Sequence, residues 1–288
     1  MKYDRHLTSR ACDGYELLDS GENMKLERFG VFSTARPETQ ALWSKRSPER
    51  WHEAGAVFAF DGATKGSWDV RSAPPEDWEV SWGDLRLGAR LTNFKHTGVF
   101  PEQAPNWEWS KARIAQLESP DVLNLFGYTG AASIVAAQAG AKVTHVDASK
   151  QSLDWAGENA KRSGLAHDAI RWLLDDALAF AKREARRDHT YDGIILDPPA
   201  FGRGAKGEVW KIEEDLVTLL TVLRGLLSEA PGSFFLLNGY AAGYAPRSFA
   251  QAVESAFGDV DGESGELHIE ETGTGRAIPS GIYARFVR

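Results

Sequence analysis

The 288-residue sequence lacks several features that define common protein classes. Cys12 is its only cysteine, so neither an internal disulfide nor a cysteine-rich zinc site can form. No window approaches the roughly 18 apolar residues of a membrane span, and the polar residues 1–21 lack the apolar core of a secretory signal. The chain also has no internal repeat and no low-complexity segment. These absences predict a globular cytoplasmic protein with no membrane segment and no metal site.

A basic excess is missing as well. The chain has 33 Lys and Arg residues against 41 Asp and Glu residues, a formal net charge of −8. Proteins that follow a phosphate backbone usually show the opposite balance, so the total charge gives a nucleic-acid partner no support. A local cluster such as RRDH, residues 186–189, could still bind phosphate. Cations in the last turn of a helix are, however, favoured by the helix dipole alone.

Aromatic residues are concentrated in the first part of the chain. Residues 1–110 hold seven of the ten tryptophans, together with short alternating runs such as AVFAF at 56–60. Such runs, separated by Gly, Pro and Asp, predict antiparallel strands and hairpins. The tryptophans could form a base-stacking surface, although packing in a core is their commoner use. We therefore predict a β-rich, Trp-rich subdomain over residues 1–110.

Residues 111–288 alternate between apolar strand-like runs and amphipathic helical stretches. Alternation of this kind predicts a doubly wound, mostly parallel sheet with helices on both faces, an α/β class. The last two runs suggest an antiparallel addition at one edge, which gives a seven-stranded sheet in total. The predicted strands are 122–126, 142–147, 169–174, 192–197, 233–238, 265–271 and 281–288.

The ends of the first two strands of this sheet indicate a nucleoside site, because ligands bind beyond the carboxyl ends of parallel strands. Gly127 and Gly130 form a turn between strand and helix, and Asp147 ends the second strand 20 residues after Gly127 (147 − 127). A carboxylate at that place can accept hydrogen bonds from both ribose hydroxyls. A dinucleotide site would need glycine where Thr129 and Ala132 stand. The pattern favours a nucleoside without pyrophosphate, such as the adenosine of S-adenosylmethionine.

The third strand ends in DDA, residues 175–177. Asp176 is the candidate acceptor for the exocyclic amine of adenine, with the backbone N–H of Ala177 beside it. The alternative is helix capping, because aspartate is a preferred N-cap residue.

The fourth strand ends in DPPAF, residues 197–201. Proline fixes φ, has no N–H, and keeps the preceding residue extended. The carboxylate of Asp197 and a carbonyl of Pro198 or Pro199 can therefore act as fixed acceptors for the protons of a substrate amino group, while Phe201 covers a planar substrate. The two glycines that follow indicate a loop. The alternative is an ordinary strand-to-loop turn.

Three segments resemble the class I S-adenosylmethionine-dependent methyltransferases: LNLFGYTGAAS, HVDASKQSLDWAGENAKRSG and DPPAFGRGAKGEVW. The resemblance covers roughly residues 85–288 and points to the bacterial 23S rRNA methyltransferases, whose segment before the core is similar to residues 96–109. It implies a substrate-side role for Arg276, in the loop 273–281, and Arg203 follows DPPAF as a second candidate. The implied cofactor-binding residues are Phe100, Pro101, Gln103, Asn124, Phe126, Gly127, Tyr128, Gly130, Asp147, Ser149, Asp176 and Ala177.

Two departures from that group affect the predicted function. The first 85 residues are too few for the additional RNA-binding domain of the PUA type that the rRNA relatives carry. Pyrimidine C5 methylation needs a cysteine nucleophile, and neither the first nor the fourth strand end carries one. We therefore predict methylation of a nucleobase nitrogen, and the resemblance implies that the base belongs to RNA. A methyltransferase for a protein side chain or small molecule, or a non-catalytic scaffold that binds the cofactor, stays an alternative, and the oligomeric state is left open.

Overall fold

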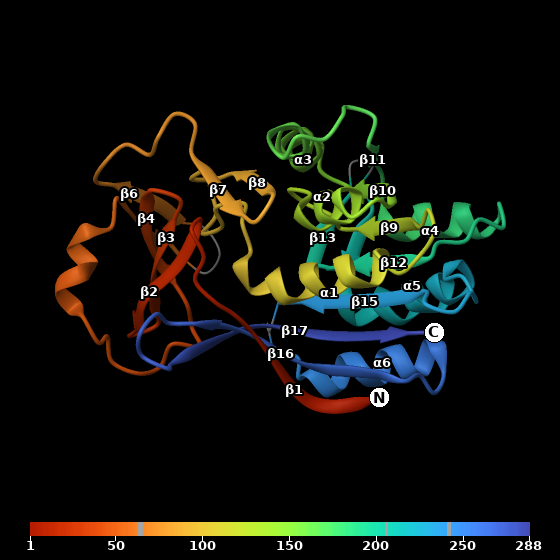
Figure 1. Ribbon diagram of the computed structural model, residues 1–288. Coiled ribbons are helices and arrows are strands. Elements are labelled where there is room, and N and C mark those ends of the chain that lie inside the picture. The colour runs from red at the N-terminus through yellow and green to blue at the C-terminus, as the bar shows by residue number, and fades with distance from the viewer. Residues whose placement is uncertain (63–65, 205–206, 241–242) are drawn as a thin grey trace. The chain divides into compact units, whose positions relative to one another are not determined.

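The computed structural model describes residues 1–62, 66–204, 207–240 and 243–288 (Figure 1). The chain divides into two compact units. The first consists of residues 1–7, 105–267 and 281–288, and the second of residues 8–104 and 268–280. The sequence suggested one boundary at residue 110, whereas in the structure each unit draws on segments that are distant along the chain.

The first unit is built on an eight-stranded sheet with the order β1-β16-β17-β15-β12-β9-β10-β11. The strands from β15 to β11 are parallel to their neighbours, and β17 is antiparallel to β15. The predicted α/β class is thus confirmed. The sheet has eight strands instead of seven because β1, from the start of the chain, joins its edge. The strands are β1 (Lys2–Ser9), β9 (Asp121–Leu125), β10 (Lys142–Asp147), β11 (Ile170–Leu174), β12 (Gly193–Leu196), β15 (Phe234–Gly239), β16 (Gly262–Glu270) and β17 (Ala277–Val287).

Helices cover both faces of this sheet. His145 of β10 contacts Ser133 of α2, whereas its neighbour Val146 belongs to the apolar cluster under α4, α5 and α6. Successive strand residues point to opposite faces, so α2 lies across the sheet from α4 to α6. The helix α6 was not predicted, although Pro246 begins it and Gly258 ends it. The helices are α1 (Ala104–Ile114), α2 (Ala131–Gln138), α3 (Lys150–Arg162), α4 (Ala177–Ala185), α5 (Ile212–Leu226) and α6 (Pro246–Phe257).

The second unit holds a five-stranded sheet, β2-β3-β4-β5-β6, and the hairpin β7-β8. Trp78 is buried, packs edge-on against Phe32, and donates its indole N–H to the carbonyl of Phe29. Trp78 therefore serves packing, whereas Trp43, Trp51, Trp68 and Trp82 are half-buried. The elements are β2 (Tyr15–Gly21), β3 (Met24–Phe29), β4 (Phe32–Pro37), η1 (Pro48–Glu53), β5 (Ala56–Phe60), β6 (Gly66–Val70), β7 (Glu79–Trp82), β8 (Leu85–Gly88) and η2 (Pro101–Gln103).

None of the described helices is both long and apolar enough to cross a membrane.

Candidate active site

The turn after β9 has a left-handed backbone conformation that residues other than glycine rarely adopt. Phe126 has φ = 56°, Tyr128 has φ = 47° and Gly130 has φ = 88°. The N–H of Gly127 donates to the carbonyl of Val146 at 3.2 Å, and the N–H of Gly130 donates to the carbonyl of Gly127 at 3.0 Å. Non-glycine residues with left-handed backbone are strained and cluster at ligand sites. The FGYTG turn is therefore fixed at the carboxyl edge of the sheet.

A buried polar network of Asn124, Ser133 and His145 packs against this turn. The Nδ2 of Asn124 donates to the Oγ of Ser133 at 2.8 Å, and that oxygen lies 2.9 Å from Nδ1 of His145. Burial lowers the pKa of His145 to about 3, so its ring is neutral at physiological pH. A Cβ on Gly127 would lie 2.3 Å from Cε1 of this ring, which explains why glycine is needed there. The amide of Asn124 is used in this network, and its contact with a cofactor stays a prediction.

Asp147, at the end of β10, is bonded through both carboxylate oxygens. Its Oδ2 accepts the N–H of Tyr128 at 2.9 Å, and its Oδ1 accepts the N–H of Ser149 at 2.8 Å. Burial raises the pKa of Asp147, and these two backbone hydrogen bonds oppose the rise. A carboxylate has about four acceptor sites, so two remain for hydroxyl groups. This geometry fits the ribose of a nucleoside.

The residues beside Asp147 cap helices. The Oγ of Ser149 accepts the N–H of Ser152 at the start of α3, and Oδ1 of Asp176 accepts the N–H of Ala179 at the start of α4. The capping alternative for Asp176 thus exists in the structure. Its other oxygen carries no hydrogen bond within the described residues, so a contact with adenine stays a prediction, as does that of Ala177.

Leu174 was not considered from the sequence. It ends β11 directly beside Asp147 in the strand register, and its side chain is exposed. Exposed apolar surface next to Asp147 would suit the face of a purine. The signal available was an apolar run that continues to the last residue before DDA.

The DPPA turn follows β12, next to the FGYTG turn. The N–H of Asp197 donates to the carbonyl of Leu125 at 3.4 Å, which places Asp197 one strand away from the FGYTG turn. The carbonyl of Pro199, predicted to be available to a ligand, accepts the indole N–H of Trp210 at 2.7 Å. The carbonyl of Pro198 carries no hydrogen bond within the described residues. Pro198 is therefore the better candidate of the two for a second acceptor.

A short hairpin takes the place of the predicted loop after DPPA. Its strands are β13 (Phe201–Arg203) and β14 (Val209–Lys211), which pair antiparallel. The ring of Trp210 is buried and lies 4.9 Å from the ring of Phe126, centroid to centroid. Phe201 lies on the opposite side of the hairpin and is 54% exposed. Trp210 thus connects the DPPA turn to the FGYTG turn and leaves Phe201 exposed.

Comparison with known proteins identifies the family. Residues 58–267 match the S-adenosylmethionine-dependent methyltransferase family. A SAM-dependent methyltransferase from Agrobacterium tumefaciens is 40% identical, with a TM-score of 0.94, and the match covers 99% of this chain and 95% of that one. The chain belongs to the S-adenosylmethionine-dependent methyltransferases. Its cofactor is S-adenosylmethionine, as the glycine spacing and Asp147 predicted.

Other relatives of this methyltransferase are more distant or much longer. A Streptococcus mutans structure named as a candidate SAM-dependent methyltransferase is 19% identical, with a TM-score of 0.74 over 96% of this chain and 75% of that one, which shows the shared fold. The ribosomal RNA large subunit methyltransferase K/L of Pseudomonas putida is 40% identical over 157 residues, 54% of this chain. The Pseudomonas aeruginosa protein of that name is 34% identical over 59% of this chain. This chain spans only about a fifth of the length of these two relatives, 20% and 22%.

Three of the predicted cofactor-binding residues belong to the second unit. Phe100 precedes the short helix η2, which contains Pro101 and Gln103. Their contact with the cofactor stays a prediction.

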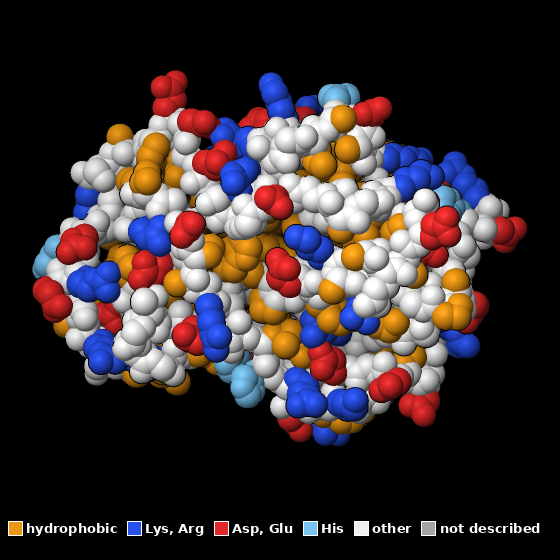
Figure 2. Space-filling view, viewed as in Figure 1, with side chains coloured by type: hydrophobic (Ala, Val, Ile, Leu, Met, Phe, Trp, Pro, Cys, Tyr) orange, Lys and Arg blue, Asp and Glu red, His pale blue; other side chains and the backbone are white. Residues whose placement is uncertain are grey.

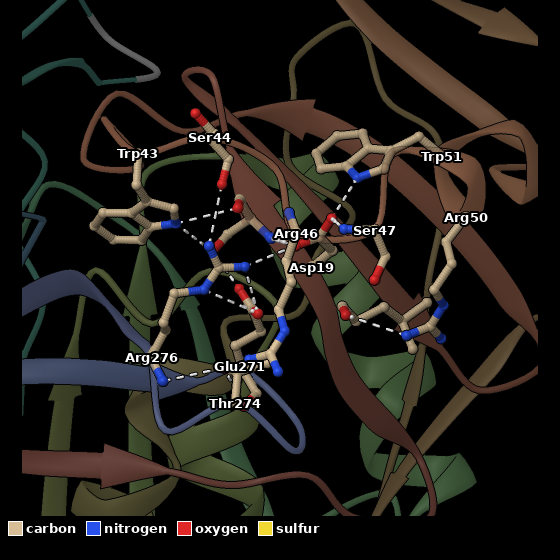
Figure 3. Close-up of polar contacts among 12 residues, drawn as sticks. Asp19, Trp43, Ser44, Arg46, Ser47, Arg50, Trp51, Glu271, Thr274 and Arg276 are labelled. Carbon is tan, nitrogen blue, oxygen red and sulfur yellow. Dashed lines mark hydrogen bonds and ion pairs between the residues drawn. The ribbon is translucent and has the colours of Figure 1, made fainter.

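Arg276 also belongs to the second unit, where carboxylates hold it (Figure 3). Its guanidinium donates to Oδ1 of Asp19 at 2.9 Å and to Oε1 of Glu271 at 2.6 Å. Asp19 is buried and also accepts the indole N–H of Trp51 at 2.8 Å. These contacts give Arg276 a clear structural role, and a contact with substrate stays a prediction.

Proposed function

We propose that this methyltransferase methylates a nitrogen of a nucleobase in RNA. The observation that supports this most directly is the arrangement around Asp197. Asp197, whose side chain is half-buried, is followed by Pro198, whose carbonyl has no hydrogen bond to the described residues. Phe201, with an exposed aromatic ring, begins the next strand. All three lie on the segment beside the FGYTG turn. Two acceptors and a stacking ring match an amino group on a planar base.

The chain's residues would act mainly by positioning. S-adenosylmethionine supplies an electrophilic methyl group. Asp197 and the Pro198 carbonyl accept hydrogen bonds from the two N–H groups of the substrate amino group, which makes the nitrogen more tetrahedral and withdraws its lone pair from conjugation with the ring. The nitrogen then takes the methyl group, S-adenosylhomocysteine leaves, and the carboxylate of Asp197 can take the surplus N–H proton and pass it to water. Phe201 stacks on the base and fixes its orientation. Alignment of two bound reactants can contribute on the order of 7–11 kcal/mol to lowering a barrier.

RNA is proposed as the substrate class for two reasons. The Pseudomonas relatives are named for methylation of ribosomal RNA, and they match 54% and 59% of this chain. A stacking ring beside paired acceptors is the way proteins read an unpaired base. Carbon-5 chemistry is disfavoured because it needs a cysteine nucleophile, and neither the FGYTG turn nor the DPPA turn carries a cysteine.

The substrate class can be tested with methyl-tritiated S-adenosylmethionine. The purified protein would be incubated with ribosomal RNA from a strain that lacks the gene, and separately with that strain's protein extract and its small-molecule fraction. We expect label that ribonuclease releases and protease does not. Label found only in protein or in small molecules would overturn the proposal of an RNA substrate.

A further inference from the structure

A group of exposed cations lies far from the site described above. Lys142 begins β10, Arg171 lies on β11, and Lys182, Arg186 and Arg187 lie at the end of α4; we call these five residues the α4 patch. All five are exposed. Figure 2 shows Lys and Arg side chains gathered at the upper right, over the region of α4 and β11 in Figure 1. A chain with a net charge of −8 therefore still presents a basic surface.

The fold brings these cations together from separate parts of the chain. Leu173 packs against the apolar cluster that includes Phe180 of α4, and Arg171 lies two residues earlier on β11. Residues two apart on a strand share a face, so Arg171 lies on the face that α4 covers. In the register Arg171 pairs with Thr144, two residues after Lys142 on the neighbouring strand. The patch is thus a product of tertiary structure as well as of the RR sequence.

Carboxylates lie beneath the cations and hold some of them in place. Glu184 is 1% exposed and accepts a hydrogen bond at 2.8 Å from Arg187, whose side chain is 62% exposed. Asp121 is 18% exposed and lies 3.5 Å from Lys142, which is 77% exposed. Burial raises the pKa of Glu184, but hydrogen bonds from Tyr191 and Arg187 outweigh it and leave the pKa below its ordinary value. Glu184 and Asp121 are both largely covered, so the surface that solvent meets here is mainly cationic.

The other three cations are available to a ligand. Arg171, Lys182 and Arg186 form no ion pair within the described part of the chain. Two exposed acids, Asp168 and Asp188, lie close to them in sequence and reduce the net charge without covering the patch. A guanidinium presents several N–H donors in a planar fork that matches phosphate oxygens.

The patch is separate from the cofactor site. α4 begins with its cap Asp176 at the carboxyl edge of the sheet and ends near the opposite edge, where His189 contacts Asp121 at the start of β9. The five residues of β9 span about 16 Å at about 3.3 Å per residue. Substitutions in the patch therefore leave Asp147 and Asp197 untouched.

We propose that the α4 patch binds the phosphate backbone of the RNA substrate, remote from the base that reacts. This inference rests on the RNA substrate proposed above. Phosphate contacts supply most of the affinity of RNA-binding surfaces and set the orientation of the nucleic acid, while base contacts select the target. On a protein with a negative net charge, a local basic surface attracts phosphate while acidic surface repels it. This difference favours one orientation of the bound RNA.

The test compares two triple variants of equal charge. The first, Arg171→Gln/Lys182→Gln/Arg186→Gln, removes the unpaired cations and spares those that cover Glu184 and Asp121. The control, Lys2→Gln/Lys111→Gln/Arg247→Gln, removes three exposed cations elsewhere in the same unit, with Lys2 on β1 at the other end of the sheet. Both should keep the melting temperature and the affinity for S-adenosylhomocysteine of the wild type.

Binding to ribosomal RNA would be measured by filter binding between about 0.05 and 0.2 M KCl. The salt slope is the slope of log affinity against log salt concentration, and each lost phosphate contact lowers its magnitude by about 0.7–0.9. We expect the slope of the patch variant to be smaller by about 2–3, and its affinity at 0.1 M salt to be lower by at least about tenfold. The control should keep the wild-type slope. Polyglutamate, an acidic polymer without phosphate, should compete poorly with RNA for the wild type.

The outcomes separate the two proposals. A patch variant with the wild-type slope would overturn the inference while leaving an RNA substrate in place, provided that the wild type binds and methylates RNA. Equal competition by polyglutamate would overturn the assignment to phosphate. A wild type that neither binds nor methylates RNA would overturn both proposals.

Discussion

Asp147 at the carboxyl edge of the large sheet accepts hydrogen bonds from two backbone N–H groups, whereas Glu184 towards the other edge accepts them from the side chains of Tyr191 and Arg187. The difference decides what each carboxylate can do. Backbone donors orient Asp147 and leave part of its acceptor capacity and its charge to a ligand. Tyr191 and Arg187 occupy acceptor sites of the Glu184 carboxylate, and this carboxylate holds the exposed guanidinium of Arg187 in place. Changes at Asp147 should therefore affect cofactor binding, and changes at Glu184 should affect stability.

The largest effect is expected for Asp197, which belongs to the ligand-facing edge. Asp197→Ala should lower kcat by roughly 10²-fold or more, the scale of losing one preorganised polar group in an active site. Asp197→Asn should be milder because its amide oxygen still accepts one hydrogen bond. Turnover on the RNA substrate, melting temperature and cofactor affinity would be measured together. A fall of melting temperature and cofactor affinity in parallel with kcat would show that Asp197 is structural and would exclude the proposed role in catalysis.

Asp147 should respond through cofactor affinity. Asp147→Ala should weaken binding of S-adenosylmethionine by about 1.5–3 kcal/mol, the usual range for hydrogen bonds to a charged group. The control is Asp154→Ala, which removes an exposed carboxylate on α3 that pairs only with Lys150 among the described residues. Isothermal titration calorimetry would measure both variants. Unchanged affinity in Asp147→Ala would contradict the ribose-binding role.

Glu184 should respond through stability. Glu184→Gln should lower the free energy of unfolding by about 1–3 kcal/mol, because Gln keeps one acceptor and loses the charge that Arg187 meets. Cofactor affinity should not change. Asp188→Asn, at an exposed position, should stay within about 0.5 kcal/mol of the wild type. Urea unfolding would measure the three proteins.

The same variant carries a pH signature. The pKa of Glu184 in the folded protein lies below its ordinary value of 4.5, so its stabilisation is complete above about pH 4.5 and is lost as the pH falls through the folded pKa. The difference between wild type and Glu184→Gln should therefore shrink at acidic pH. A difference that stays constant would show that the charge of Glu184 contributes nothing.

The smallest expected effect concerns Trp210, which lies beside the DPPA turn at the ligand-facing edge of the sheet. Trp210→Phe keeps a buried ring against Phe126 but removes the N–H that bonds the carbonyl of Pro199, a loss of about 1 kcal/mol. We expect a several-fold loss of turnover because the DPPA turn loosens. Trp68→Phe removes a similar indole bond, to the carbonyl of Thr92 in the second unit, and should leave turnover unchanged. Equal turnover in both variants would exclude a positioning role for Trp210.

Local patterns made much of the fold predictable. The parallel strands, the helices between them and the ligand-facing edge follow from apolar periodicity and strand ends, which are properties of short windows. β1 could not be placed, because its pairing with β16 joins segments that are far apart in the chain. The α6 helix had a usable signal in Pro246, Gly258 and apolar residues at helical spacing, Phe249, Val253 and Phe257.

The site was predictable in position but not in its supporting contacts. Asp147 and Asp197 were found because strand ends and proline chemistry can be recognised in sequence. The bond from Trp210 to Pro199 was missed because residues 209–211 continue into a helical pattern and their strand depends on pairing with β13. The Asn124–Ser133–His145 network was missed because it brings together β9, α2 and β10, whose contacts no local pattern specifies.

Asp197 is proposed to take part in methylating a nucleobase nitrogen in RNA. The most direct test is mass spectrometry of nucleosides from the rRNA and tRNA of a deletion strain, complemented with either the wild-type gene or the Asp197→Ala variant. We predict that one N-methylated nucleoside disappears in the deletion strain, returns with the wild type, and stays absent or strongly reduced with Asp197→Ala at equal protein level. An unchanged set of methylated nucleosides, the loss of a carbon-methylated nucleoside, or full restoration by Asp197→Ala would contradict the account.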